Sequence, residues 1–148
     1  MTAPIVEITR REEFSASHRL HNASLSDAEN AEAFGICNNA HGHGHNYELE
    51  VTVRGPIDER TGMVLNLNDL MGLLQERIVE RLDHKHLNHD VPFLEGRVTT
   101  AENVSVAIWD ELAPLVRKTE GCRLHRIRLY ESRSNFVEYR GPESESTS

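Results

Sequence analysis

The chain has 148 residues, of which 38% are apolar and 27% are charged, proportions typical of one water-exposed globular domain. It contains no apolar run near the roughly 20 residues that a membrane-spanning helix needs, so we expect no membrane partner. The net charge of −8 disfavours nucleic-acid binding, which depends on cationic neutralisation of phosphates, and favours a small-molecule partner.

The first segment, "MTAPIVEITRREEF", lacks the basic, apolar and small-residue parts of a secretory signal, so we expect a cytoplasmic protein. In that compartment the two cysteines, Cys37 and Cys122, are expected to stay reduced. We expect a single domain over residues 1–141, followed by a polar, flexible tail over residues 142–148, "PESESTS".

Two segments in the first third of the chain alternate apolar and polar residues, as strands do. The alternation is partial over residues 5–20 and strict over residues 45–55, which predicts two antiparallel strands. Between them, Ser26 and Glu29 have capping-box spacing and Gly35 can end a helix. We therefore predict a short helix inside a long insertion between the strands.

The middle of the chain changes to helical spacing. One stripe after Asn66 contains Leu67, Leu70, Met71, Leu74, Ile78 and Leu82, which predicts a helix that ends near residues 82–90. Thr99 and Glu102 suggest a capping box for a second helix, with Pro114 in its last turns. Residues 123–131 and 135–141 alternate again, so the predicted order is ββααββ and the class is α+β.

Histidines extend the apolar face of the two first strands. Alternation carried back from Tyr47 places His43 and His45 on that face, and the same count in the first strand adds His18. Three inward imidazoles are unfavourable unless a partner satisfies them. Zinc suits them, because catalytic zinc commonly has three protein ligands and an open fourth position. We predict one zinc ion per chain, bound by these three histidines.

Two neighbouring residues leave alternatives open. His41 has the same alternation but precedes the regular part of the strand, so it is the weaker ligand candidate, and a histidine-rich loop without metal is the simplest alternative to the whole site. Cys37 lies six residues before His43. It is either a fourth ligand or a free thiol that ionises more readily beside a cation and transfers protons. We expect Cys122 to be a small, buried apolar residue.

Carboxylates and a further imidazole could carry protons. Asp83 and His84 stand together at the end of the first long helix. Adjacent helical residues do not face one another, so we expect this pair to act jointly on a third group. Glu131 shares the alternation of Ile127 and Leu129, so it faces the apolar side unless the strand ends before it.

Several motifs together resemble the 6-pyruvoyl tetrahydropterin synthase family. They are "FSASHRL", "CNNAHGHGHNYELEVTVRGPIDERTGMVLNLNDL", "RLDHKHLNHDVPFLE", "TTAENV", "IWDEL" and "YESRSNFVEYRG". The resemblance covers residues 14–141, nearly the whole chain, in the family's order. It implies the tunnelling fold, in which two antiparallel strand pairs flank two helices on one face. Three subunits then close a barrel, two trimers stack into a homohexamer, and active sites lie between subunits.

The resemblance also implies an activity, which is conversion of 7,8-dihydroneopterin triphosphate to 6-pyruvoyltetrahydropterin with loss of triphosphate. The family is a zinc-dependent lyase of tetrahydrobiopterin biosynthesis, and Mg²⁺ would accompany the triphosphate. The implied site comprises the zinc ligands His18, His43 and His45, the catalytic residues Cys37, Asp83, His84 and Glu131, and the substrate-binding residues Glu131, Thr100 and Glu102. Cys37 and the Asp83–His84 pair would come from different chains.

Spacing separates this family from related enzymes. The 6-carboxytetrahydropterin synthases of queuosine biosynthesis, which the chain also resembles, have their cysteine four residues before the first paired zinc histidine, whereas pyruvoyl synthases have six. Both spacings occur here, to His41 and to His43. The ten-residue step from His45 to Gly55 favours the second. The carboxy synthase and a non-catalytic, zinc-stabilised oligomer remain the alternatives.

Overall fold

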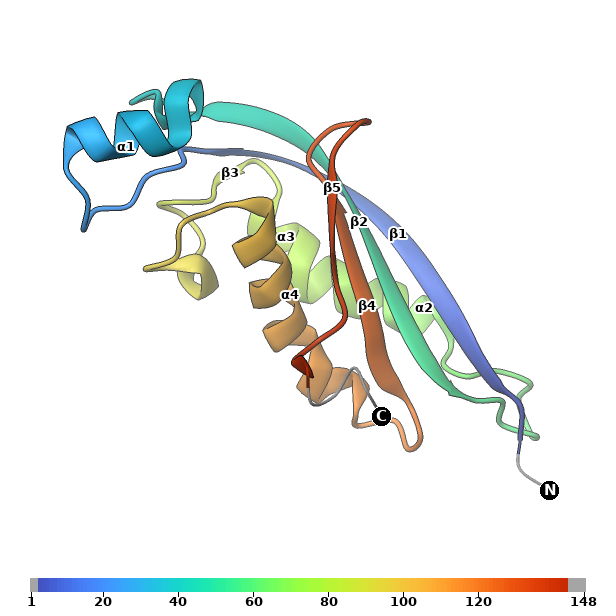
Figure 1. The fold of residues 1–148 in the computed structure, drawn as a ribbon. Helices are drawn as coiled ribbons and strands as arrows, with labels where there is room; N and C mark the ends of the chain where they lie inside the picture. The colour runs from blue at the N-terminus through green and yellow to red at the C-terminus, as the bar shows by residue number, and fades with distance from the viewer. Residues whose placement is uncertain (1–2, 144–148) are drawn as a thin grey trace.

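The computed structural model describes residues 3–143, which fold as one mixed sheet covered on one face by helices (Figure 1). The sheet has five strands in the order β3-β1-β2-β4-β5. The strands are β1 (Ile5–His18), β2 (His43–Pro56), β3 (Lys85–His86), β4 (Arg123–Tyr130) and β5 (Phe136–Tyr139). The helices are α1 (Asp27–Phe34), α2 (Leu67–Leu74), α3 (Glu80–Leu82) and α4 (Ala101–Val116), with short turns η1 (Gly35–Asn38), η2 (Gln75–Val79) and η3 (Pro92–Leu94). The predicted α+β class is confirmed.

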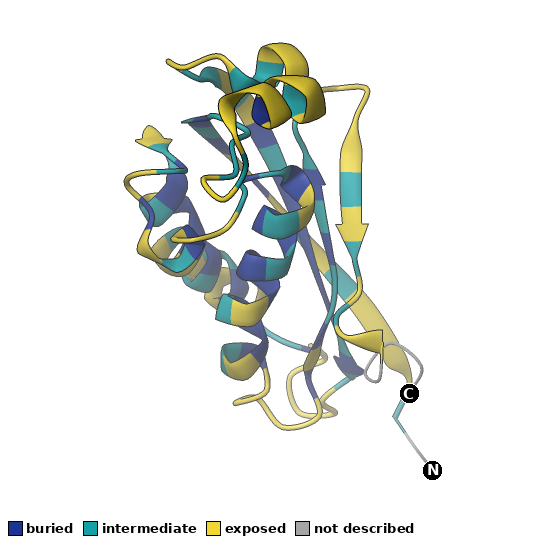
Figure 2. Cartoon of the chain, turned by 60° about the vertical axis from the view of Figure 1, so that its left-hand side comes forward, coloured by how far each residue is buried: buried dark blue, intermediate teal, exposed yellow. Residues whose placement is uncertain are grey.

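The core lies between the sheet and the helices α2, α3 and α4, where Figure 2 shows the buried segments facing one another. Leu49, Val51 and Ile127 of the sheet, together with Leu74 and Leu112 of the helices, are fully buried there. Burying side chains of this size stabilises a fold by roughly 1.5–3 kcal/mol each relative to full exposure. The sheet and these helices therefore form a rigid, packed layer.

The antiparallel pairing of β1 with β2 is confirmed and runs without a shift from Ile5↔Pro56 to His18↔His43. Because strand side chains alternate between faces, Phe14 and His18 lie on the helix-covered face together with Tyr47. The rings of Phe14 and Tyr47 stack with centroids 4.9 Å apart. This uninterrupted register brings the histidines of the two strands together at one end.

The predicted insertion helix is α1, at the far end of the β1–β2 pair (Figure 1). Ser26 accepts a hydrogen bond from the Glu29 backbone N–H, and the Glu29 carboxylate accepts one from the Ser26 N–H. Gly35 ends the helix with φ 55°, a conformation that favours glycine. The capping box and the glycine stop are both confirmed.

The long helix begins after Asn66, where the helical spacing starts and where the Asn66 side chain caps it, but the helix is not regular. Five residues of π-helix (η2) interrupt it between α2 and α3. The stripe residues Leu70, Leu74, Ile78 and Leu82 are buried, whereas Leu67, at the first position, is 51% exposed. The stripe therefore reaches the core only from its second member onward.

One local prediction was wrong, and one strand was missed. The N-cap of α4 is Thr100, whose hydroxyl accepts the Asn103 N–H, and not Thr99. The edge strand β3 was not predicted, because two residues are too short to show alternation. It pairs in parallel with β1 at Ala16↔Lys85 and adds an edge to the sheet beside the histidines.

None of the helices among residues 3–143 has the length and apolar character needed to cross a membrane. Of the predicted tail, residues 144–148 lie outside the described residues. The closed barrel and the hexamer stay predictions, because they involve further chains.

Candidate metal centre and active site

Three histidines meet where the β1–β2 pair ends toward α1. His18 is the last residue of β1, and His43 opens β2 directly opposite it. His45 follows two residues later on the same face, and one ring nitrogen from each histidine lies within 4.8 Å of the other two. The expected convergence of these side chains is confirmed as a group that is arranged to hold a metal ion.

His18 is buried, with 1% of its surface exposed, and its ring is fixed on one side. Its Nδ1 lies 2.7 Å from the Thr99 carbonyl oxygen, and because a carbonyl only accepts, Nδ1 carries the proton. The Nε2 lone pair is then free to bind a metal. The pKa of His18 is lowered to about 4, mainly by burial and also by the nearby His43 and His45, against the opposing effect of the Thr99 bond. The ring is therefore neutral near pH 7.

The other two rings fit the same interpretation. The Nε2 atoms of His18 and His43 are 3.1 Å apart, close to the roughly 3.3 Å between donors in a tetrahedral zinc site with Zn–N distances of about 2.0–2.1 Å. The Nε2 of His45 is buried without a hydrogen-bond partner among the described residues. A buried polar atom rarely stays unsatisfied, so the three donors fit a metal ion.

The two other candidates near the centre are not part of this group. His41 is exposed in the turn before β2. Cys37 is half-buried in η1, carries a free thiol, and is tied to the end of β1 through its carbonyl, which accepts the Leu20 N–H at 2.9 Å. The Cys37 backbone therefore lies beside Leu20, two residues past His18, and its thiol is not part of the three-histidine group.

Glu131 faces the metal centre, which answers the question left open by its position after β4. Its Oε2 lies 3.9 Å from Nε2 of His45, and its side chain is 29% exposed. The pKa of the Tyr47 hydroxyl is raised, mainly by burial and also by the charge of Glu131. A cavity of about 410 Å³ is lined by Glu131 and His45, a volume suited to a small molecule.

Asp83 and His84 contact each other directly, contrary to the expectation that they only face a third group. His84 Nδ1 lies 2.8 Å from Asp83 Oδ2. The pair has left the helix, because Asp83 is extended (ψ 131°) and His84 adopts φ 59°. Ser15 holds both residues through its backbone: its N–H donates to Asp83 Oδ1 and its carbonyl accepts the His84 N–H.

These contacts set the charge of Asp83 and the tautomer of His84. The Ser15 N–H, followed by the His84 side chain, lowers the pKa of Asp83. The carboxylate therefore stays ionised and keeps Nδ1 of His84 protonated, leaving Nε2 to exchange a proton. The His84 side chain is 82% exposed.

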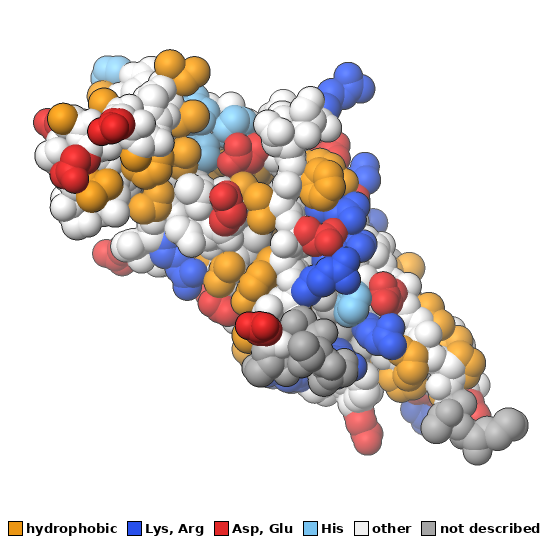
Figure 3. All heavy atoms as spheres, viewed as in Figure 1, with side chains coloured by type: hydrophobic (Ala, Val, Ile, Leu, Met, Phe, Trp, Pro, Cys, Tyr) orange, Lys and Arg blue, Asp and Glu red, His pale blue; other side chains and the backbone are white. Residues whose placement is uncertain are grey.

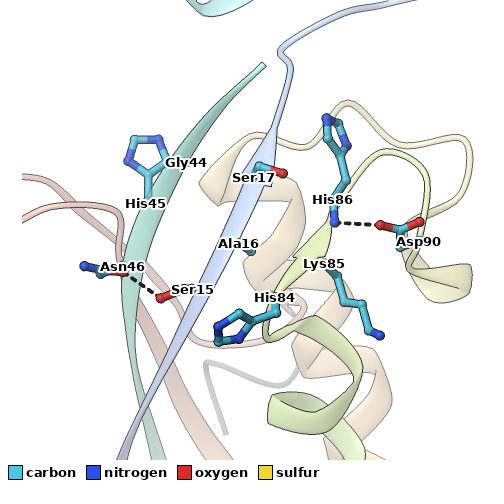
Figure 4. A pocket seen from close by; sticks show the side chains of 10 residues that line it. All are labelled: Ser15, Ala16, Ser17, Gly44, His45, Asn46, His84, Lys85, His86 and Asp90. Carbon is cyan, nitrogen blue, oxygen red and sulfur yellow. Dashed lines mark hydrogen bonds between the residues drawn. The ribbon is translucent and has the colours of Figure 1, made fainter. Parts of the chain in front are cut away.

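Figure 4 shows how His84 and His45 lie around an open cleft of about 570 Å³. His45 projects from β2 on the side away from His84, which lies beyond β1 next to Ser15. On the surface, Figure 3 shows histidine atoms emerging between the α1 end of the molecule and the β4–β5 loop. Within one chain His84 and His45 thus border the same cleft from different sides.

The two predicted substrate contacts lie at the N-terminal end of α4. The Thr100 hydroxyl serves as the N-cap, and Glu102 is exposed. Sequence reasoning missed Thr99 and Ser15, which contact His18 and Asp83 respectively. Both act through backbone atoms, so no residue-type signal could have revealed them.

The fold and this site define a class of protein: an α+β enzyme with a sheet-borne three-histidine metal centre, next to a carboxylate and a carboxylate–imidazole pair. Residues 7–142 match the family described as 6-pyruvoyl tetrahydropterin synthase. The chain belongs to this family of enzymes, and the resemblance drawn from its motifs is confirmed.

The most similar individual proteins that we compare carry the name of the same family. A Drosophila melanogaster protein named 6-pyruvoyl tetrahydrobiopterin synthase is 52% identical over 94% of this chain and 82% of its own length. A Homo sapiens protein of the same name is 49% identical over 91% of each chain. The solved structure of Caenorhabditis elegans 6-pyruvoyl tetrahydropterin synthase is 39% identical, covers 96% of this chain and 99% of its own, and has a TM-score of 0.89.

Proposed function

We propose that the protein is a zinc-dependent 6-pyruvoyl tetrahydropterin synthase that converts 7,8-dihydroneopterin triphosphate to 6-pyruvoyltetrahydropterin and triphosphate, in the cytoplasm. The observation that carries this proposal is the identity of 49–52% to proteins bearing that name, over more than nine-tenths of the chain. The three-histidine centre supports it chemically, because the reaction needs a polarised side-chain hydroxyl.

His18, His43 and His45 would hold the zinc ion. Zinc there would act as a Lewis acid that makes the substrate's side-chain hydroxyl groups more acidic. His18 contributes a neutral ring whose proton is committed to the Thr99 carbonyl, so its Nε2 is available as a donor. The buried Nε2 of His45 gains the partner that it otherwise lacks.

Glu131 would orient the pterin ring. The aminopyrimidinone edge of a pterin presents neighbouring N–H donors, and a carboxylate accepts two such bonds in parallel. The cavity beside Glu131 and His45 would place the ring next to the metal centre, with the side chain of the substrate toward the histidines. We retain Thr100 and Glu102 as further substrate contacts, at the start of α4.

Proton transfer would fall to Cys37 and to the Asp83–His84 pair. The thiol would take a proton from the substrate side chain, and His84 would exchange a proton through Nε2 while Asp83 holds Nδ1. The exposure of His84 in one chain supports a site completed by a neighbouring subunit, so we propose the homohexamer of two stacked trimers. Mg²⁺ would accompany the triphosphate group.

Incubation of the zinc-loaded protein with 7,8-dihydroneopterin triphosphate, followed by mass spectrometry of the pterin products, tests the proposal. We expect 6-pyruvoyltetrahydropterin and one equivalent of triphosphate. A Glu131→Gln variant, which loses the charge but keeps the shape, should raise KM while retaining zinc. Formation of 6-carboxytetrahydropterin would instead identify the queuosine-pathway enzyme. Zinc binding without turnover would identify a non-catalytic oligomer.

A further inference from the structure

The side chain of Asn88 joins two segments that are distant in sequence. Its Oδ1 accepts the Arg19 N–H at 2.9 Å and the Thr99 hydroxyl at 3.1 Å. Its Nδ2 donates to the Arg19 carbonyl at 2.7 Å. Asn88 thus makes both backbone bonds of Arg19, much as a neighbouring strand would, and one side-chain bond to Thr99.

Both of those segments determine the position of His18. Arg19 follows His18 directly in the chain, and the Thr99 carbonyl accepts the His18 Nδ1–H at 2.7 Å. The ring therefore points its Nε2 at the metal centre only while the end of β1 and the Thr99 carbonyl keep their separation. Asn88 is bonded to both sides of that gap.

Local structure fixes the shape of the Thr99 segment but not its distance from β1. Thr100 caps α4, and the Asn103 side chain donates to the Val98 carbonyl at 2.9 Å, so the residues on both sides of Thr99 are bound within their own element. Besides the His18 bond itself, the described residues show a longer bond at 3.4 Å from the Thr99 hydroxyl to the carbonyl of Arg19, the residue after β1. The hydrogen bonds of the Asn88 side chain, at 2.9 Å to Arg19 and 3.1 Å to Thr99, are shorter and connect the same two segments.

We propose that Asn88 is a positioning residue for the metal ligand His18: it holds the Thr99 carbonyl at the distance that keeps Nδ1 protonated and Nε2 aimed at the metal. The inference rests on the proposed metal site. Groups that orient a ligand through its second nitrogen typically change metal affinity by about 10–100-fold when they are removed.

The test compares Asn88→Ala with a matched control, Asn30→Ala. The Asn30 side chain also accepts the N–H and binds the carbonyl of a single residue, Asn22, at 2.8 and 3.0 Å, but within the α1 insertion. Both variants lose the same type of backbone bridge. A third variant, Asn88→Asp, keeps the oxygen that accepts from Arg19 and Thr99.

Zinc affinity is measured by competition with a chelating dye, and thermal unfolding is followed on the same samples. We expect Asn88→Ala to weaken zinc binding by about 10–100-fold, Asn88→Asp to recover most of this loss, and Asn30→Ala to bind zinc as the unaltered protein does. Both alanine variants should unfold at lower temperature. Equal zinc affinity in Asn88→Ala and the unaltered protein would reduce Asn88 to a purely structural residue.

A second readout needs no metal. Nitrogen-15 chemical shifts of the His18 ring in metal-free protein report which nitrogen carries the proton. We expect the Nδ1–H form in the unaltered protein and in Asn30→Ala, and a mixture of both forms in Asn88→Ala. Should the unaltered protein bind no zinc, the proposed metal site fails, while these shifts still decide whether Asn88 positions the ring. An unchanged Nδ1–H form in Asn88→Ala would overturn the proposal.

Discussion

The histidines of the metal centre differ in the groups that lie next to their ring nitrogens. His18 donates to a carbonyl, while His45 has a carboxylate, Glu131, 3.9 Å from the same nitrogen that would bind metal. Glu131 is therefore close enough to influence the centre electrostatically but is too far for a hydrogen bond. Cys37 lies outside the three nitrogens, which suits a proton-transfer role better than ligation.

Replacing Cys37 tests that role. Cys37→Ala should keep zinc and pterin binding, because the three histidines and Glu131 remain, but lower kcat by about 10²–10⁴-fold, the usual contribution of a positioned acid or base. Cys37→Ser should recover little, since a hydroxyl is a much weaker acid than a thiol. Metal analysis and single-turnover kinetics measure the two properties separately.

X-ray absorption on the substrate-free protein provides the independent check for Cys37. A zinc–sulfur distance of about 2.3 Å, the value for thiolate ligation, would contradict the proton-transfer assignment. A centre with nitrogen and oxygen neighbours alone would agree with it.

At the scale of elements, the ends of strands and helices carry the site. β1 ends at His18 and β2 begins at His43, the Asp83–His84 pair follows α3 directly, and α4 begins one residue after Thr100. Helix ends suit this purpose because their backbone groups are not all bonded within the helix. The cap of α4 therefore helps to hold the Thr99 carbonyl against His18.

Removal of the Thr100 cap should measurably lower the stability of the protein. Thr100→Ala should lower the free energy of unfolding by about 1 kcal/mol, because the Asn103 N–H loses its acceptor, whereas Thr100→Ser should cost much less. Urea unfolding monitors both. Ser26→Ala in α1 is the comparison, since it removes a cap of the same kind away from α4. Equal stability of Thr100→Ala and the unaltered protein would show that the cap contributes nothing.

At the scale of the whole molecule, a single chain exposes a proposed functional side chain and an apolar side chain to solvent. His84 is 82% exposed, and Ile36, next to Cys37, is 92% exposed. An apolar side chain and a proton-transfer residue in such positions are consistent with contacts to another subunit. A shared site would account for the positions of His84 and His45, which border the cleft from different sides within one chain.

Mixing two inactive variants tests the shared site. Cys37→Ala and His84→Ala proteins, combined under conditions that exchange subunits, should regain part of the activity, because some sites then receive an intact thiol and an intact histidine from different chains. Turnover before and after mixing is the measurement, and mass spectrometry of isotopically labelled subunits confirms exchange. Persistent inactivity despite exchange would place both groups in one chain.

Periodicity alone determined much of this protein. Alternation over β1 and β2 predicted which face carries His18, His43 and His45, capping residues located α1, and helical spacing located the start of α2. These predictions succeed because side-chain direction follows directly from strand and helix geometry, and because capping depends on residues three positions apart.

Tertiary structure decided the rest. The direct Asp83–His84 contact, the edge strand β3, and the bonds from Ser15, Thr99 and Asn88 follow from how β1 meets segments some 70–80 residues away. Most of these bonds involve backbone N–H and C=O groups, which nearly every residue carries. Residue identity therefore cannot indicate which of them will meet, and only the packed chain selects the carbonyl that orients His18.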